Sequence, residues 1–121
     1  MSKVMIVEDD AIMLSLLKTL LEIEGFQTVI VDHRQNMDTV LEALNLESPD
    51  LLLLDVHLDR YNGFDLLRFL RKDNDLNHMR ILVSSGSDLS RECTQAGVDG
   101  FILKPYMPED LINQIYDLLG K

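Results

Sequence analysis

The sequence of 121 residues is poor in cysteine and in long hydrophobic runs. Its single cysteine, Cys93, excludes an internal disulfide bond and suits a reducing compartment. No apolar run approaches the roughly 18 residues that a membrane-spanning helix needs, and the N-terminus lacks the pattern of a secretory signal. We therefore expect a cytoplasmic protein that does not associate with a membrane.

Positive charge is also scarce. The chain has 11 Lys and Arg residues against 21 Asp and Glu residues, which gives a formal net charge of −10. Nucleic-acid phosphates require clustered Lys and Arg, so we expect no direct contact between this chain and a nucleic acid. The acidic excess as a whole is typical of a soluble protein, and it also permits a bound metal cation or a basic partner.

Short apolar runs alternate with amphipathic stretches along the chain. With 46% hydrophobic residues, the length suits one domain with one core, and we predict a single domain over residues 1–121. The runs predict buried strands at residues 4–7, 28–31, 51–54, 81–83 and 101–103. The amphipathic stretches predict helices at residues 10–24, 36–46, 63–72, 88–96 and 108–119. This alternation predicts an α/β fold, a doubly wound parallel sheet covered by helices on both faces.

Individual residues mark where the helices begin and end. Asp10 is the expected N-cap of the first helix, and Gly25 is its expected C-terminal stop. Ala96-Gly97 is expected to end the fourth helix, and Cys93 should lie on that helix's inner face.

Charged side chains follow three of the predicted strands. Glu8 and Asp9 follow the first strand, and Asp55 ends a run of four leucines. Lys104 follows the fifth strand. Functional groups of a doubly wound sheet gather at the carboxyl ends of its strands, and strands 1 and 3 are neighbours if the order is the flavodoxin-like 2-1-3-4-5. These side chains are therefore predicted to form one site.

Such a site suits a metal ion and phosphoryl transfer. Neighbouring carboxylates repel one another, which favours either a shared proton or a bound cation. Oxygen ligands without a Cys or His cluster favour Mg²⁺. With Mg²⁺ and Lys104 holding phosphoryl oxygens, Asp55 could attack phosphorus and form an aspartyl phosphate. Ser84, just past the fourth run, could donate a hydrogen bond to the same oxygens.

The order Glu8-Asp9, Asp55, Ser84 and Lys104-Pro105 resembles the receiver domain of two-component response regulators, the CheY-like family. The resemblance covers the chain from the first strand to the fifth helix. It implies a (βα)5 fold with strand order 2-1-3-4-5. It also implies a phosphorylation-activated switch that catalyses only its own phosphorylation and dephosphorylation.

The resemblance also assigns roles to the metal-binding residues. Asp55 matches the phospho-acceptor, Asp9 matches a direct Mg²⁺ ligand, and Glu8 matches an acidic residue that acts through water. The backbone carbonyl of His57 matches a third protein ligand, whereas its side chain is expected on the loop surface.

Three further residues match the family's phosphoryl-binding and switch positions. Ser84 and Lys104 match the groups that hold the phosphoryl oxygens, and Ser84 with Phe101 matches the switch pair. The bond between Lys104 and Pro105 is often cis in this family.

The sequence departs from the family pattern beside the phospho-acceptor. The family usually has proline four residues after that aspartate, where this chain has Asp59, which we expect to be a solvated loop charge. His57 and Gly86 occupy positions that modulate dephosphorylation in the family, and the direction of their effect does not follow from the sequence.

The helix at residues 10–24 carries more apolar residues than one buried face requires. The residues expected to face the core are Met13, Leu17 and Leu20. Two flanks remain, one with Ile12 and Leu16 and the other with Leu14 and Leu21. The helix is either deeply embedded or presents a docking surface at Ile12 and Leu16, with Tyr106 as a second contact. The resemblance makes the partner a sensor histidine kinase or a histidine phosphotransfer protein.

The output partner is expected to be a downstream effector protein or a covalently linked output domain absent from this chain. Three other functions fit the sequence less well. A flavin-binding module would need a phosphate-binding loop where Glu8-Asp9-Asp10 would repel phosphate. A haloacid-dehalogenase-like phosphatase would carry its nucleophile after the first strand. A pseudo-receiver that is never phosphorylated would not require the full set of site residues.

Overall fold

The computed structural model describes the chain except residues 1, 32–35, 59–60, 74–75 and 77. The strands are β1 (Lys3–Val7), β2 (Gln27–Val31), β3 (Leu51–Asp55), β4 (Arg80–Ser85) and β5 (Gly100–Leu103). The helices are α1 (Ala11–Ile23), α2 (Met37–Glu47), α3 (Gly63–Lys72), α4 (Ser90–Gln95) and α5 (Pro108–Leu119). The strands pair in parallel in the order β2-β1-β3-β4-β5, which confirms the predicted fold class and strand order.

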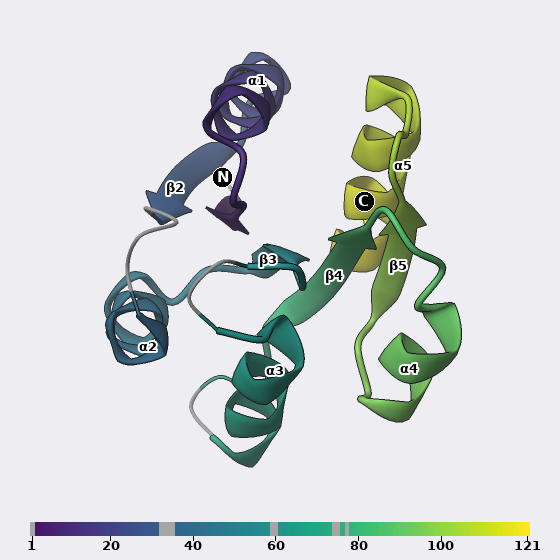
Figure 1. Cartoon of the computed structure of the whole chain (residues 1–121). Helices are drawn as coiled ribbons and strands as arrows, with labels where there is room; N and C mark the ends of the chain where they lie inside the picture. Colours follow the sequence, from purple (N-terminus) through teal and green to yellow (C-terminus); the bar gives the residue numbers. More distant parts are fainter. Residues whose placement is uncertain (1, 32–35, 59–60, 74–75, 77) are drawn as a thin grey trace.

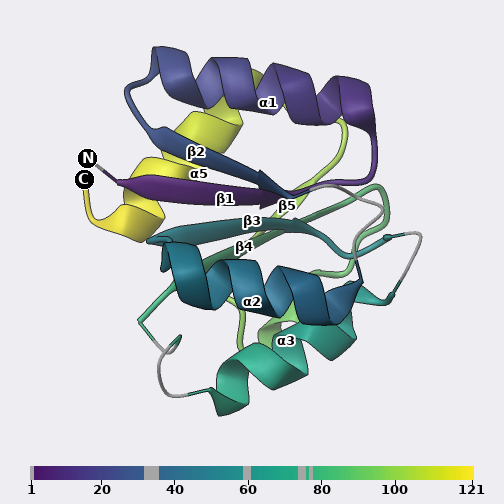
Figure 2. The same cartoon turned by 90° about the vertical axis from the view of Figure 1, so that its left-hand side faces the viewer.

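Helices cover both faces of this sheet. Helices α1 and α5 lie on one face, and α2, α3 and α4 lie on the other (Figures 1 and 2). The apolar runs explain this arrangement because successive side chains of a strand point to opposite faces. On β1, Met5 and Val7 belong to the core beneath α2, α3 and α4, whereas Val4 and Ile6 belong to the core beneath α1 and α5.

The strands all end at one edge of the sheet. Figure 2 shows their arrowheads pointing the same way, with the loops that follow β1 and β3 at the same edge. This edge holds the charged residues predicted to form a site. In the part of the chain that the structure describes, none of the helices is long and apolar enough to cross a membrane.

The expected helix caps of α1 and α4 are confirmed, but the start of α4 differs. Asp10 Oδ1 accepts hydrogen bonds from the backbone N–H of Ile12 at 2.9 Å and of Met13 at 3.2 Å. Gly25 and Gly97 follow α1 and α4 with φ of 93° and 76°, a conformation that favours glycine. Helix α4 begins at Ser90 rather than at residue 88.

A side-chain turn explains the late start of α4. Asp88 Oδ1 accepts from the N–H of Ser90 at 3.1 Å and from its hydroxyl at 2.6 Å, which holds the preceding residues outside the helix. Cys93 is buried on the inner face of α4, as predicted.

The buried face of α1 is rotated from the predicted one. Leu17 and Leu21 are buried, whereas Met13 and Leu20 are only partly buried. The assignment of Leu21 to a flank was therefore wrong. The helix packs on β1 and β2 from a direction that the helical pattern alone does not specify, because apolar residues surround most of it.

Candidate functional site

Three charged side chains from three separate segments meet at the carboxyl edge of the sheet. Lys104 Nζ donates to Glu8 Oε1 at 2.9 Å and to Glu8 Oε2 at 3.1 Å. It also donates to Asp55 Oδ2 at 3.1 Å. The neighbouring positions of β1 and β3 in the sheet bring Glu8 and Asp55 together, as the sequence predicted.

Burial distinguishes this cluster from surface ion pairs. Glu8 is 3% exposed and Asp55 is 7% exposed. The other buried polar residues of the described chain are Ser84 and Ser85, which end β4 at the same edge. Removing a charge from water is costly unless it is paired, so this concentration of buried polar groups indicates a functional site.

Backbone hydrogen bonds fix the residues that directly follow Asp55. The N–H of His57 donates to Asp55 Oδ1 at 2.9 Å, and the N–H of Gly63 donates to the carbonyl of Val56 at 3.1 Å. A Cβ on Gly63 would lie 2.7 Å from the Cα of Val56, so the start of α3 can approach this loop only with glycine there. The loop conformation therefore depends on the helix that follows it.

A hydrogen bond that the sequence did not predict links the segment after β3 to the last residue of β4. The ring nitrogen Nε2 of His57 lies 3.0 Å from Ser85 Oγ, and Ser85 Oγ accepts from the N–H of Ser87 at 3.0 Å. His57 is exposed, as expected for a loop residue, but its side chain is fixed by this contact. No sequence signal pointed to it, because 27 residues separate the two partners.

Electrostatics at the cluster are dominated by the burial of Glu8. Burial raises the pKa of Glu8 to about 7, and the nearby Asp55 carboxylate raises it too, although the Lys104 ammonium lowers it. Burial alone would lower the pKa of Lys104, but its hydrogen bonds and attraction to Glu8 and Asp55 raise it overall. Lys104 is therefore charged at neutral pH.

The raised pKa of Glu8 predicts that the metal-free protein loses stability as pH rises. The folded chain binds the Glu8 proton more tightly than the unfolded chain does, so the stabilisation is complete below pH 4.5 and is lost as pH rises to about 7. Urea unfolding followed by circular dichroism, with a chelator present, measures this change. The Glu8→Gln variant should show a flatter profile over the same range, and equal slopes would contradict the assignment.

The oxygen ligands that the site offers suit Mg²⁺, although the acidic side chains do not form a complete metal site among the described residues. Glu8, Asp9 and Asp55 offer only carboxylate oxygens, which a hard cation prefers. Asp9 is half-buried at the end of β1. Among the described residues, no three acidic, His or Cys side chains stand together as a ready metal site. Lys104 instead supplies the positive charge between Glu8 and Asp55.

The predicted switch residues flank the cluster. Ser84 is buried and is paired in register with Asp55, and the fourth and fifth strands place Phe101 beside Val83. Phe101 is half-buried against the core beneath α3 and α4. The bond between Lys104 and Pro105 is cis, as the resemblance suggested. Asp59 lies outside the described residues.

Two of the three predicted docking residues, Leu16 and Tyr106, line an apolar hollow on the α1 side. Ile12 and Leu16 are 74% and 62% exposed, so α1 is not deeply embedded. A hollow of about 420 Å³ lies between α1 and the segment after β5, and Leu16 and Tyr106 both line it. Burial raises the pKa of Tyr106 to about 12, so its phenol stays protonated.

Comparisons with known proteins agree with this geometry. Residues 4–116 match the model of the response regulator receiver domain. The transcriptional regulatory protein CpxR of Escherichia coli (strain K12) is 36% identical over 123 residues, a match that covers all of this chain and 50% of CpxR. This chain thus spans about half the length of the curated relatives that it matches.

Solved structures show the same fold. A CheY-like receiver domain protein from Methanospirillum hungatei JF-1 superposes with a TM-score of 0.87 and 28% identity, covering 99% of this chain and 94% of that one. The receiver domain of sensor histidine kinase PA1611 from Pseudomonas aeruginosa PAO1, which has a magnesium ion in its active-site cleft, superposes with a TM-score of 0.85 and 20% identity over 99% of this chain and 98% of that one.

Proposed function

Because this chain belongs to the response regulator receiver domain family, we propose that it is a phosphorylation-controlled switch whose phospho-acceptor is Asp55. The observation that carries this proposal is the contact of Lys104 Nζ with the buried carboxylates of Asp55 and Glu8. A carboxylate at the open end of a buried strand, beside a fixed ammonium, is suited to attack phosphorus.

The proposed reaction transfers a phosphoryl group from a histidine to Asp55. One Asp55 oxygen forms a bond to phosphorus, the phosphorus–nitrogen bond of the phosphohistidine breaks, and the nitrogen keeps the electron pair and takes up a proton. Asp9, Asp55 and the His57 carbonyl would hold Mg²⁺, with Glu8 acting through a water molecule. Bound Mg²⁺ would neutralise carboxylate charge and stabilise the charge on the phosphoryl oxygens.

The residues of the site then change partners. Lys104 exchanges Glu8 for a phosphoryl oxygen, and the hydroxyl of Ser84 donates to another oxygen of the same group. Phe101 follows this movement at the β5 end of the sheet, which changes the surface of α4, β5 and α5. Transfer and hydrolysis take place on the protein itself, so the product is a changed binding surface.

The phosphodonor is proposed to dock on α1. A sensor histidine kinase or a histidine phosphotransfer protein would contact Ile12 and Leu16, and Tyr106 would border the contact. This surface lies beside the site, because α1 begins directly after the acidic residues that follow β1. The exposed apolar side chains support docking because exposed apolar patches commonly mark protein contacts.

The Ile12→Ala variant should receive phosphoryl groups from its partner about tenfold less efficiently, because an anchor at an interface contributes more than about 1 kcal/mol. Its phosphorylation by acetyl phosphate and its unfolding midpoint should stay unchanged. Phosphotransfer kinetics from the purified phosphodonor measure the effect. Leu46→Ala is the control, since Leu46 is 84% exposed on α2 at a distance from α1. Equal loss in both variants would argue against docking on α1.

The output of the switch is proposed to pass to another domain or protein. The matched relatives include a "DNA-binding response regulator", and this chain covers about half of their length. With its net charge of −10, this chain would not itself contact a nucleic acid, so a linked output domain or an effector protein would carry the response.

The test of this function is mass spectrometry of the intact protein after incubation with acetyl phosphate and Mg²⁺. A gain of one phosphoryl group supports the switch. No gain, together with no response to beryllofluoride, would favour the pseudo-receiver instead. A flavin-binding or phosphatase role has less support, because the acidic loop follows β1 and the candidate nucleophile ends β3.

A further inference from the structure

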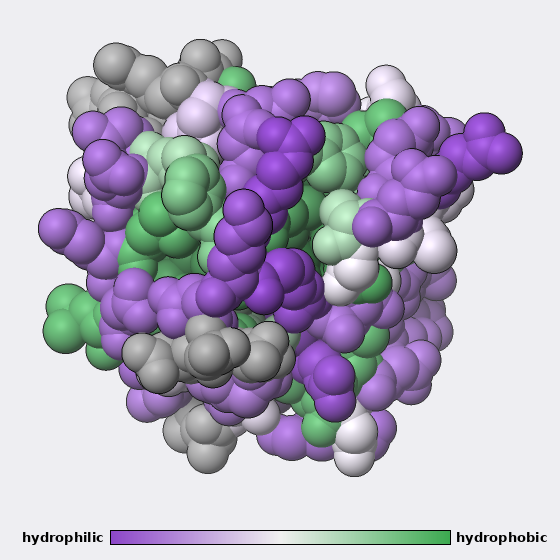
Figure 3. All heavy atoms as spheres, turned by 90° about the horizontal axis from the view of Figure 1, so that it is seen from below, coloured by the Kyte–Doolittle hydropathy of each residue, from purple (hydrophilic) through white to green (hydrophobic). Residues whose placement is uncertain are grey.

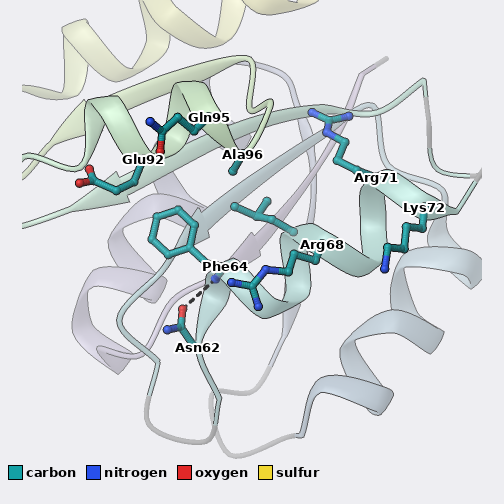
Figure 4. Close-up of a pocket in the computed structure, with 9 residues that line it drawn as sticks. Asn62, Phe64, Arg68, Arg71, Lys72, Glu92, Gln95 and Ala96 are labelled. Carbon is teal, nitrogen blue, oxygen red and sulfur yellow. Dashed lines mark hydrogen bonds between the residues drawn. The ribbon is translucent and has the colours of Figure 1, made fainter.

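A second hollow lies between α3 and α4, on the side of the sheet opposite α1. Its volume is about 620 Å³. The side chains of Phe64, Leu67 and Ala96 give it an apolar lining. In Figure 4, Phe64 projects into the space between the two helices, and Glu92 and Gln95 of α4 border the other side. None of these residues belongs to the Asp55 site.

Three cations from a single helix border this hollow. Arg68, Arg71 and Lys72 lie along α3, and Glu92 is the acidic residue of the lining. The chain has only 11 Lys and Arg residues in total, so three of them in ten residues of helix is a marked concentration in an acidic protein. These cations make the surface locally more basic than the acidic remainder of the chain.

Two of these cations have hydrogen-bonding capacity that the described residues do not use. The Nε–H of Arg71 is buried and has no acceptor among the described residues, which is costly for a buried donor. The same guanidinium donates through Nη2 to Asp99 at 3.2 Å, so its position is fixed. Lys72 is exposed and forms no ion pair with any residue that the structure describes.

Arg68 and Lys72 lie between two hollows and line both of them. On the other side of these cations, a hollow of about 270 Å³ is lined by Met37 and Phe69 together with Arg68, Lys72 and Asp65, the last of which pairs with Arg68. Phe69 is 53% exposed although it lies in the middle of α3. Figure 3 views this end of the molecule and shows hydrophobic areas divided by strongly hydrophilic side chains. The surface across α3 is therefore apolar, then basic, then apolar.

The stability of α3 explains only part of this pattern. Cations in the last turn are favourable at a helix C-terminus, and Arg68 pairs with Asp65 at 2.7 Å one turn earlier. Neither effect requires an exposed phenylalanine or a hollow on each side of the cations. A bound segment that covered Phe69 and accepted hydrogen bonds from the cations would account for the cations, the exposed phenylalanine and the two hollows together.

We propose that the surface formed by α3 and the α3–α4 hollow binds an acidic polypeptide segment of a partner protein, with a large apolar side chain in each hollow and carboxylates on Arg68, Arg71 and Lys72. The two hollows lie on opposite sides of α3, so one small molecule could not fill both. A helix is about 10 Å across, and residues i and i+4 of an extended chain, which lie on the same face, are about 13 Å apart. This proposal does not depend on phosphorylation of Asp55.

The test uses the full chain without phosphodonor and a fluorescent peptide that has leucines at positions i and i+4 and a glutamate at i+2. Fluorescence anisotropy measures its affinity, and amide chemical-shift mapping locates it. We expect saturable binding with shifts confined to α3, α4 and the α2 start. Lys72→Glu should weaken binding at least tenfold, and Phe69→Ser should weaken it several-fold. Both side chains are exposed, so neither change should unfold the protein.

The matched control is Lys18→Glu, which makes the same charge change at an exposed lysine that pairs with an acidic residue of α1. It should bind the peptide within twofold of the wild type. Absence of saturable binding, equal losses in the two charge variants, or undiminished binding of a peptide with glutamine in place of glutamate would overturn the proposal. Full displacement by inorganic pyrophosphate with no effect of Phe69→Ser would do the same, because that outcome describes a simple anion site.

Discussion

The Asp55→Asn variant is expected to take up no phosphoryl group from acetyl phosphate and Mg²⁺, under conditions in which the wild type gains one. An amide oxygen is a poor nucleophile, so the change removes the reacting group and preserves its volume. The contact with Lys104 would lose one carboxylate charge, yet Glu8 keeps two hydrogen bonds from the same ammonium. Intact-protein mass spectrometry measures the outcome, and the expected loss is complete.

A matched control lies at the other end of the same strand. Asp50 directly precedes β3 and accepts from the backbone N–H of Lys3 at 2.8 Å, at the edge of the sheet opposite the site. Asp50→Asn should be phosphorylated like the wild type. Phosphoryl uptake by Asp55→Asn would instead assign the acceptor to another residue, and peptide mapping would identify it.

The Lys104→Met variant is expected to be destabilised and slow to be phosphorylated. The methionine keeps most of the side-chain stem but removes the only cation that contacts Glu8 and Asp55 among the described residues. Two buried carboxylates would then face each other without compensation, and breaking a buried pair costs about 3 kcal/mol or more. Urea unfolding at pH 8 in a chelator, above the pKa of about 7 that Glu8 has in the wild type, measures this loss.

Magnesium should partly restore the stability of Lys104→Met, because a bound cation replaces the lost ammonium. The rescue should be larger than the effect of magnesium on the wild type. Lys3→Met is the control, since Lys3 is also half-buried and pairs with Glu47 at 3.3 Å, but at the other edge of the sheet. A metal-free Lys104→Met protein as stable as the wild type would show that Lys104 does not balance the two acids.

The charged residues of the site, Glu8, Asp55 and Lys104, were predictable because each follows an apolar run. A run of buried leucines must end where the chain reaches an edge, so the carboxylate of Asp55 had to lie at the sheet boundary. Residues at the carboxyl ends of parallel strands share one edge, which brought Glu8 and Lys104 into the same prediction. The contacts of Lys104 with both acids followed from that topology.

Other features depend on pairs of residues that carry no local pattern. The hydrogen bond between His57 and Ser85 joins the segment after β3 to the last residue of β4, two positions that the parallel pairing of these strands brings together. The buried face of α1 was misassigned because apolar residues surround most of the helix. The α3–α4 hollow was missed, although the concentration of Lys and Arg in α3 was visible in the sequence.

Local sequence patterns are enough to predict the alternation of strands and helices, the helix limits set by Asp10, Gly25 and Gly97, and the acidic residues at the strand ends. These features arise from neighbouring residues, whose periodicity and caps act locally. The position of Lys104 between Glu8 and Asp55 became visible only in the folded chain. The same is true of the two hollows that flank the cations of α3. Those arrangements depend on distances between elements, which are fixed when the helices pack on the sheet.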